Sequence, residues 1–251
     1  MIRLDSVTHD YGRGPVVRDV SMELGSGRVT VLCGPNAAGK TTLLRIMAGV
    51  LEPTSGRVLL GDRSFDQLGA RGRARRLAFM SQRFECASGF TVRRILELAR
   101  VMIGRDRNAI DAVVEALELG DLLSRTLATL STGQAQRVAC ARALIQAPAD
   151  GVVLLDEPLA SLDPAWSERV GALLMRRARE GTTVVVSVHE LHVAARLAED
   201  AMLISTGCTL QHGSAATILA PQALEAAFGV PFETVRTTAG VDVPLPMMPR
   251  S

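Results

Sequence analysis

Apolar and polar residues alternate through the first part of the chain. Residues 2–32 alternate between the turns Gly12-Arg13-Gly14-Pro15 and Gly25-Ser26-Gly27, and they end in the apolar run Val29-Thr30-Val31-Leu32-Cys33. Alternation predicts strands with one buried face, and the closing run predicts a strand buried on both faces. A helix over residues 42–50, stopped by Pro53, and a strand over residues 57–60 are expected next.

The pattern changes between about residue 86 and residue 147, where the sequence no longer favours strands. Segments 91–103 and 109–119 carry apolar residues at helical spacing, which predicts an inserted helical subdomain. After Pro148, the runs 152–155 and 182–188 predict two buried strands separated by a helix over residues 166–179. Strands that alternate with helices indicate an α/β core with a parallel sheet.

The tail begins near Gly207 and is expected to add short strands and a helix near residues 221–228. A hairpin is predicted through Thr237-Thr238-Ala239-Gly240, before a proline-bearing end. We find no internal repeat and no low-complexity tract in the sequence.

Composition narrows the class of protein. The 251 residues are 47% hydrophobic, enough for one domain with a sizeable core, and no stretch approaches the length of about 20 apolar residues that spans a bilayer. The first residues lack a signal-peptide pattern, so we expect a cytosolic chain. With 28 basic and 26 acidic side chains, a net charge of +2 gives no general attraction to nucleic acid.

The cysteines do not indicate a metal or disulfide framework. Cys33, Cys86, Cys140 and Cys208 lie far apart and form no C-x-x-C pair. We interpret them as small core residues in a reducing compartment.

The one exact phosphate-binding pattern of the chain is Gly34-Pro35-Asn36-Ala37-Ala38-Gly39-Lys40-Thr41, which matches G-x-x-x-x-G-K-[ST] between a buried strand and a helix. Among the 28 Lys and Arg residues only Lys40 is a lysine, so this position requires a compact ammonium group. Backbone N–H groups would hold phosphates, Lys40 would reach the β and γ oxygens, and Thr41 would ligate Mg²⁺. The ATP-contacting residues predicted here are Gly34, Pro35, Asn36, Ala37, Ala38, Gly39, Lys40, Thr41 and Thr42.

Two carboxylates follow the buried run 152–155. Asp156 and Glu157 would lie at the carboxyl edge of the parallel sheet, where open α/β folds bind ligands. We expect Asp156 to hold Mg²⁺, through water, and Glu157 to act as the general base on the attacking water. A charged loop start is the alternative interpretation, and the phosphate loop argues against it.

The segment Leu130-Ser131-Thr132-Gly133-Gln134 precedes a predicted helix that runs to about Gln146. Ser131 and Gln134 have capping-box spacing and would cap this helix whatever its function. The same helix N-terminus can also bind a phosphate. The segment alone does not decide between the two.

In their order along the chain, the motifs resemble those of ABC ATPases. The phosphate loop, Gln82, the segment 130–134 with Gln136-Arg137, Asp156-Glu157-Pro158, Ser161-Leu162-Asp163 and His189 cover essentially the whole sequence. The resemblance implies a P-loop NTPase core with an N-terminal antiparallel β subdomain. We divide one domain, 1–251, into a core (1–85 and 148–206), a helical subdomain (86–147) and a C-terminal extension (207–251).

The resemblance also implies a homodimer in which each ATP lies between two copies. The segment Ser131, Thr132, Gly133 and Gln134, together with Asp163, would then contact the partner's nucleotide in trans. His189 would contact the γ-phosphate, and Gln82 would sense Mg²⁺ and a membrane partner. Alone, a histidine at such a place is more often structural.

Tyr11, the only tyrosine, occupies the position where such ATPases stack an aromatic ring on adenine, although packing in the core is an alternative. The chain departs from the family pattern at Ala37 and Thr132, each of which replaces a common glycine. We expect the Ala37 methyl group to be harmless and Thr132 to affect the rate of hydrolysis. The basic cluster Arg71-Gly72-Arg73-Ala74-Arg75-Arg76 is interpreted as a solvated face, not as a nucleic-acid site.

Among ABC proteins, the leading hypothesis is the ATPase of a transporter. The segments Phe90-Thr91-Val92-Arg93, Ala227-Phe228-Gly229-Val230 and Glu233-Thr234-Val235 resemble ATPases that import iron siderophores, haem or cobalamin. This resemblance implies integral membrane permease subunits, an extracytoplasmic substrate-binding protein and a location at the cytoplasmic face of the inner membrane. A soluble ABC ATPase and an exporter with separate membrane subunits are the alternatives.

Overall fold

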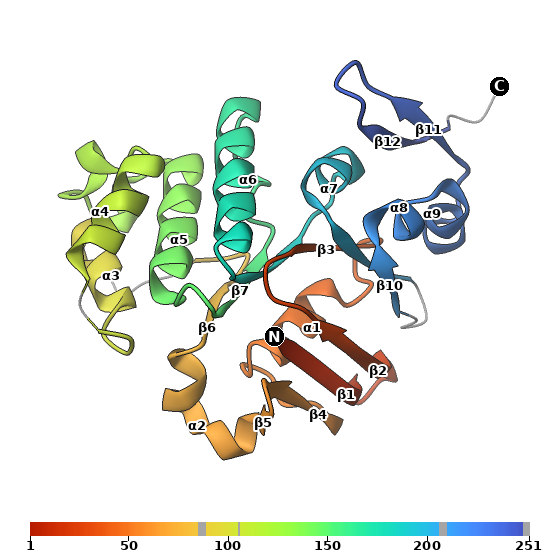
Figure 1. The fold of residues 1–251 in the computed structure, drawn as a ribbon, viewed down its shortest axis with the longest axis horizontal. Helices are drawn as coiled ribbons and strands as arrows, with labels where there is room; N and C mark the ends of the chain where they lie inside the picture. Colours follow the sequence, from red (N-terminus) through yellow and green to blue (C-terminus); the bar gives the residue numbers. More distant parts are fainter. Residues whose placement is uncertain (85–88, 105, 206–209, 248–251) are drawn as a thin grey trace.

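The computed structural model describes residues 1–84, 89–104, 106–205 and 210–247. Figure 1 shows an N-terminal sheet beneath a second sheet, a group of helices on one side and a C-terminal hairpin at the far end. Within these residues no helix is long and apolar enough to cross a membrane.

The N-terminal sheet is antiparallel. It contains β1 (Ile2–Asp10), β2 (Pro15–Leu24), β4 (Ser55–Leu60) and β5 (Arg63–Ser64) in the order β2-β1-β4-β5. Every second residue of β2 is buried towards its end, as alternation predicts. The expected turns at 12–15 and 25–27 separate β1, β2 and the next strand, so this prediction is confirmed.

The second sheet carries the predicted parallel core. Its order is β10-β9-β3-β8-β7-β6, in which only β10 runs antiparallel to its neighbour. Strands β3, β7 and β8 are buried at every residue, which explains their nearly continuous apolar runs. The bounds are β3 (Val29–Cys33), β6 (Leu77–Met80), β7 (Val152–Asp156), β8 (Thr183–Ser187), β9 (Asp200–Ile204) and β10 (Leu210–Ser214).

Two hydrophobic clusters cover opposite faces of this sheet. One packs helix α1 (Lys40–Met47) and the N-terminal sheet against residues such as Leu32, Leu154 and Val185. The other packs five helices from the middle of the chain against Val31, Val153 and the residues next to them. These helices are α3 (Val92–Ala99), α4 (Arg107–Ala116), α5 (Thr132–Gln146), α6 (Pro164–Arg179) and α7 (Leu191–Leu197).

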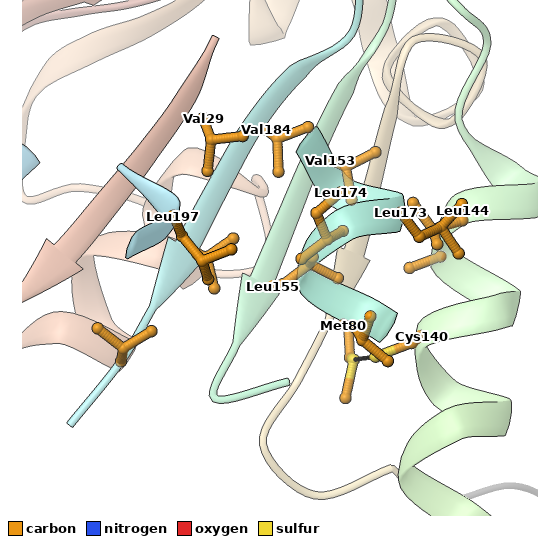
Figure 2. Packing of buried hydrophobic residues seen from close by; sticks show 14 of the residues in the cluster. Val29, Met80, Cys140, Leu144, Val153, Leu155, Leu173, Leu174, Val184 and Leu197 are labelled. Carbon is orange, nitrogen blue, oxygen red and sulfur yellow. Dashed lines mark hydrogen bonds between the residues drawn. The ribbon is translucent and has the colours of Figure 1, made fainter. Parts of the chain in front are cut away.

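Figure 2 shows how the second cluster joins the helices to the sheet. Leu174 of α6 lies beside Val153 and Leu155 of β7. Leu173 lies beside Leu144 of α5, and Cys140 of α5 lies beside Met80. Cys140 Sγ lies 3.6 Å from Met80 Sδ. Burial raises the pKa of the Cys140 thiol to about 12, so this cysteine is an inert core residue.

Among the other cysteines, the structure describes only Cys33. Cys33 is also buried, and burial raises the pKa of its thiol to about 12. The prediction of core cysteines is therefore confirmed for Cys33 and Cys140. Cys86 and Cys208 lie outside the described residues.

The helix α2 (Phe65–Ala74) was not expected from the sequence. None of its residues is fully buried, only Phe65 and Leu68 pack against the core, and Gly69 interrupts it at φ 60°, so its apolar periodicity is too short to predict a helix. Its N-terminus is nevertheless fixed by a capping box between Ser64 and Gln67. Two arginines of the basic cluster interact with other residues. The guanidinium carbon of Arg73 lies 5.3 Å from the centroid of the Phe65 ring, and Arg75 Nε donates to the carbonyl oxygen of Met102.

The predicted segments of the C-terminal part are confirmed. Helix α9 (Pro221–Phe228) follows the short α8 (Ala215–Ile218), and β11 (Phe232–Arg236) pairs with β12 (Asp242–Pro246) across the expected turn. The helices α3, α4 and α5 gather beside the core, together with the turns Gly120–Leu122 and Leu127–Thr129. Our division of the chain into core, helical subdomain and extension stays a prediction.

Candidate functional site

The phosphate loop is shaped by two glycines that no other residue could replace. Gly34 has φ 145°, and a Cβ atom there would lie 2.1 Å from the carbonyl oxygen of Ile204. Gly39 has φ 104°, and its Cβ atom would lie 2.8 Å from the carbonyl oxygen of Val16. Both the backbone angles and the space therefore demand glycine, and the loop is held between β2 and β9.

Lys40 opens helix α1 and turns back over the loop. Its buried Nζ donates hydrogen bonds to the carbonyl oxygens of Gly34 (2.8 Å) and Pro35 (2.9 Å). Burial lowers the pKa of Lys40, while nearby Glu157 acts in the opposite direction. The ammonium group is thus held at the mouth of the loop with the loop's own carbonyls as partners.

Ala37 has an unfavourable backbone conformation. Its φ is 61°, in the left-handed region that favours glycine. A Cβ atom there costs about 1–2 kcal/mol of local strain, because it approaches the following carbonyl oxygen. The alanine therefore stores strain in the loop, while the expectation that its methyl group is harmless to ATP hydrolysis stays a prediction.

Asp156 ends β7 and is completely buried. Its Oδ1 accepts a hydrogen bond of 2.7 Å from Ser187 Oγ at the end of β8, whereas no described residue bonds its buried Oδ2. A buried carboxylate oxygen of this kind is costly unless a cation or ordered water meets it.

The residues present fit Mg²⁺. The described part of the chain has no group of three His, Cys, Asp or Glu side chains that could hold a metal alone. Mg²⁺ is typically held by one or two protein oxygens together with water and substrate phosphates. Asp156 Oδ2 and the Thr41 hydroxyl, next to Lys40, would supply these protein oxygens.

Glu157 lies where several side chains converge. Gln82 Nε2 donates to Glu157 Oε2 at 2.9 Å, and His189 Nε2 forms a short hydrogen bond with Glu157 Oε1. The Glu157 carbonyl accepts a bond of 2.7 Å from Gln136 Nε2, and its N–H donates to Ser187 Oγ at 2.8 Å. Four residues from three other strand ends or helices therefore hold one glutamate.

The backbone of Glu157 adds to this picture. Its φ is 53°, a conformation that costs about 1–3 kcal/mol in a residue with a side chain and that clusters at functional sites. The hydrogen bonds from Gln136 and to Ser187 compensate for this strain. They aim the carboxylate towards Gln82 and His189 at the edge of the sheet.

The sequence did not predict that Ser187 and Gln136 hold the backbone of Glu157. Ser187 is a buried hydroxyl that bonds both acids, and the only signal was a polar residue at the end of an otherwise apolar run. Gln136 was noted within a motif, but its contact with the Glu157 carbonyl depends on how α5 packs against β7.

Tyr11 is not a core residue, because its side chain is 55% exposed. The alternative of a packing role is therefore wrong. Its hydroxyl lies 3.4 Å from Thr42 Oγ1, and the edge of its ring contacts His9 at a centroid distance of 4.5 Å. His9 in turn is fixed by a bond of 3.0 Å between Nδ1 and the Glu52 carbonyl oxygen. Tyr11 thus stands beside the phosphate-loop helix with an exposed ring.

The Ser131 segment forms the predicted capping box. Ser131 Oγ accepts from the N–H of Gln134 at 3.3 Å, and Gln134 Oε1 accepts from the N–H of Ser131 at 3.1 Å. Because α5 and α1 cover opposite faces of the sheet, this segment lies on a different face of the core from Lys40. Its predicted contact with the partner's nucleotide stays a prediction.

The N-terminus of α5 is packed against the loop that precedes α6. A Cβ atom on Gly133 would lie 3.2 Å from the Ser161 carbonyl oxygen, so the two segments nearly touch. Asp163, at the end of that loop, caps α6 by accepting from the Trp166 N–H at 2.9 Å. The two segments that the dimer hypothesis assigns to the partner's nucleotide therefore form one surface.

A cavity of about 470 Å³ opens between α6 and α7 beside Glu157 and His189. Much of its wall is apolar, including Leu162, Met175 and Val193. Phosphates require N–H and cationic donors, so we place them at the loop around Lys40 rather than in this cavity.

A family model described as "ABC transporter" matches residues 17–160. A hemin import ATP-binding protein HmuV from Rhodopseudomonas palustris (strain HaA2) is 34% identical, over 96% of this chain and 95% of its own. A protein of the same name from Pseudomonas aeruginosa is 35% identical, over 92% and 93% of the two chains.

Solved structures agree on the fold. A chain of an ABC transporter in an inward-facing conformation superposes with a TM-score of 0.81 at 22% identity, over 99% of this chain and 98% of that chain. A bacterial ABC transporter cassette solved as a dimer superposes with a TM-score of 0.77 at 27% identity, over 86% and 99%. The same cassette has been solved after hydrolysis with ADP and phosphate bound.

Proposed function

Because the chain belongs to the ABC transporter family, whose ATPases hydrolyse ATP, we propose that its ATP hydrolysis drives the import of haem. The observation that carries the enzymatic part is the convergence of Gln82 and His189 on the Glu157 carboxylate, beside the phosphate loop. The cargo is supported by relatives named for hemin import that match almost the full length of both chains. Ferric siderophore and cobalamin are the neighbouring choices of cargo.

The residues of the chain divide the chemistry among them. The loop N–H groups and Lys40 bind and orient the β- and γ-phosphates, and Tyr11 stacks on the adenine. Glu157 accepts a proton from the attacking water, and His189 holds the Glu157 carboxylate in place and contacts the γ-phosphate. Bound Mg²⁺ neutralises charge that develops on the phosphate oxygens, and Asp156, Thr41 and Gln82 are the residues that would hold it.

The proposed active unit is a pair of chains. In each site the partner's segment Ser131, Thr132, Gly133 and Gln134 and its Asp163 would close over the nucleotide. The single surface formed by the N-termini of α5 and α6 supports this arrangement, since both segments would reach the partner together.

Membrane subunits would dock beside Gln82. A cleft lined by Arg45, Arg83 and Arg142, together with Ser81 and Phe84, adjoins this residue. A cationic cleft next to a group that bonds the catalytic Glu157 suits an acidic segment of a permease. We place the chain at the cytoplasmic face of the inner membrane, held there by permease subunits that receive cargo from an extracytoplasmic substrate-binding protein.

The test uses Glu157→Gln. This change keeps the hydrogen-bonding shape but removes the base, so ATP turnover should fall by about a hundred-fold or more while ATP binding stays native. A tagged variant solubilised from native membranes with ATP and Mg²⁺ should co-purify with a polytopic permease, identified by mass spectrometry. Lys40→Ala is the matched control and should lose ATP binding itself.

The outcomes separate the parts of the proposal. Native turnover in Glu157→Gln would remove Glu157 as the base. Recovery of only soluble partners or ribosomes would favour a soluble ABC ATPase. If cells that lack the chain took up haem normally while losing siderophore or cobalamin uptake, the choice of cargo would be wrong.

A further inference from the structure

The only tryptophan of the chain lies where the helical segment meets the core. Trp166 is the third residue of α6, and its indole ring is half-buried. The guanidinium carbon of Arg137 from α5 lies 3.8 Å from the ring centroid, and that of Arg169 lies 4.9 Å from it. We call these three residues the Trp166 stack.

The stack is anchored on both sides. Arg137 Nη1 donates to the carbonyl oxygen of Leu117 at 2.9 Å, and Arg169 forms an ion pair with Glu118. Leu117 is the C-cap of α4, so the stack joins α4 and α5 to α6. Burial lowers the pKa of Arg137, while the charges of Glu118 and Asp163 raise it. The guanidinium group is therefore partly removed from water, and a cation contacts an aromatic face most strongly when it is desolvated.

The position of the stack relates it to the partner-facing surface. Arg137 follows the α5 cap Ser131 by less than two helical turns, and the backbone N–H of Trp166 donates to the side chain of the α6 cap Asp163. Gly133 touches the Ser161 loop at the start of the same two helices. The two N-termini are therefore fastened at two points, once by the glycine contact and once by the stack.

We propose that Trp166 is a positioning residue for ATP hydrolysis, because its contact with Arg137 holds Ser131 and Asp163 as one rigid surface for the partner's nucleotide. This inference rests on the paired arrangement proposed above. The interactions of the stack join α4, α5 and α6, whereas Lys40 bonds the carbonyl oxygens of its own loop, so ATP binding to a single chain should not depend on the stack.

The experiment compares ATP-driven pairing in a Glu157→Gln background, measured by gel filtration against ATP concentration. Trp166→Leu/Glu157→Gln should need about tenfold more ATP to pair than Glu157→Gln alone, since a partly desolvated cation–aromatic contact is lost. Binding of a fluorescent ATP analogue to the single chain should stay native. Without the Glu157→Gln change, Trp166→Leu should raise the KM for ATP about tenfold with little change in kcat, because turnover requires the same ATP-driven pairing.

Two further variants separate positioning from general damage. Trp166→Phe keeps an aromatic face and should recover most of the pairing. Arg176→Ala, at an exposed residue near the other end of α6, should behave like its parent. If Trp166→Leu does not fold, Arg137→Gln tests the same contact with the indole left in place.

The results distinguish this inference from the proposed function. If Glu157→Gln itself does not pair with ATP, the paired arrangement is wrong. If it pairs and Trp166→Leu/Glu157→Gln pairs at the same ATP concentration, the inference about Trp166 is wrong. A Trp166→Phe variant as impaired as Trp166→Leu would also overturn it, because size rather than the aromatic face would then be decisive.

Discussion

The N-termini of α1 and α5 are both expected to meet phosphate, yet they are built differently. Helix α1 begins from Gly39 in a left-handed conformation, with no side chain capping its first turn. Helix α5 begins from Ser131, where both halves of a capping box are present. The first end leaves its N–H donors for an anion, and the second is already partly satisfied by its own chain.

This difference suits the two kinds of phosphate contact that we propose for the chain. The α1 end needs a ligand to complete it, and it carries Lys40 as its cation. The α5 end has its first-turn N–H groups capped by its own side chains, so it needs no ligand in the single chain. In the proposed pair it would meet the nucleotide of the other copy. In the paired arrangement that we propose, ATP would bind first at the phosphate loop and the partner would close over it afterwards.

The largest expected effect is at the α1 end. Gly39→Ala would force a side chain into φ 104° and against the Val16 carbonyl oxygen, so the free energy of unfolding should fall by about 2–6 kcal/mol. ATP binding should be lost with it. Urea unfolding and equilibrium nucleotide binding measure the two effects.

Gly133→Ala is the matched change at the α5 end and should be milder. The added Cβ atom meets the Ser161 carbonyl oxygen at 3.2 Å and the backbone there is helical, so a small shift accommodates it. Equal losses in both variants would show that the two ends are not built differently.

Ser131→Ala breaks the capping box. We expect the free energy of unfolding to fall by about 1 kcal/mol, because the N–H of Gln134 loses its partner. Nucleotide binding to a single chain should stay native, whereas ATP-driven pairing should weaken. A loss of single-chain ATP affinity would contradict the separation of the two ends.

Ala37→Gly acts on the strained phosphate loop in the opposite direction. Removing the methyl group relieves about 1–2 kcal/mol of strain, and glycine's greater freedom in the unfolded chain offsets about half of this. Thermal unfolding should therefore show a slightly higher Tm. A lower Tm would mean that the methyl group makes contacts worth more than its strain.

Thr132→Gly should have the smallest effect on stability. Thr132 is the first residue of α5, where a β-branched side chain stands beside the close approach expected for a phosphate. Steady-state ATP turnover should equal or exceed that of the native chain. A large loss of turnover would show that the threonine itself contacts the nucleotide.

Much of the fold could be predicted because local patterns agree with the tertiary structure. Helix α9 begins at a proline and ends before Gly229, and the largely apolar run 29–33 coincides with the strand β3. The exception is α2, where only Phe65 and Leu68 pack against the core and no residue is fully buried, so its apolar periodicity covers a single turn. Periodicity follows burial, and a mostly exposed helix shows little of it.

The candidate site also has features that the sequence predicts and contacts that only the structure shows. The sequence by itself determined the phosphate loop, the two acids and the cap at Ser131, since each is a short pattern whose chemistry depends on neighbours in the chain. Only the tertiary structure decided that Gln82, Gln136, Ser187 and His189 converge on Glu157, and that Trp166 stacks on Arg137. These contacts join residues from different strands and helices, so they depend on strand order and helix packing, which local residue spacing does not encode.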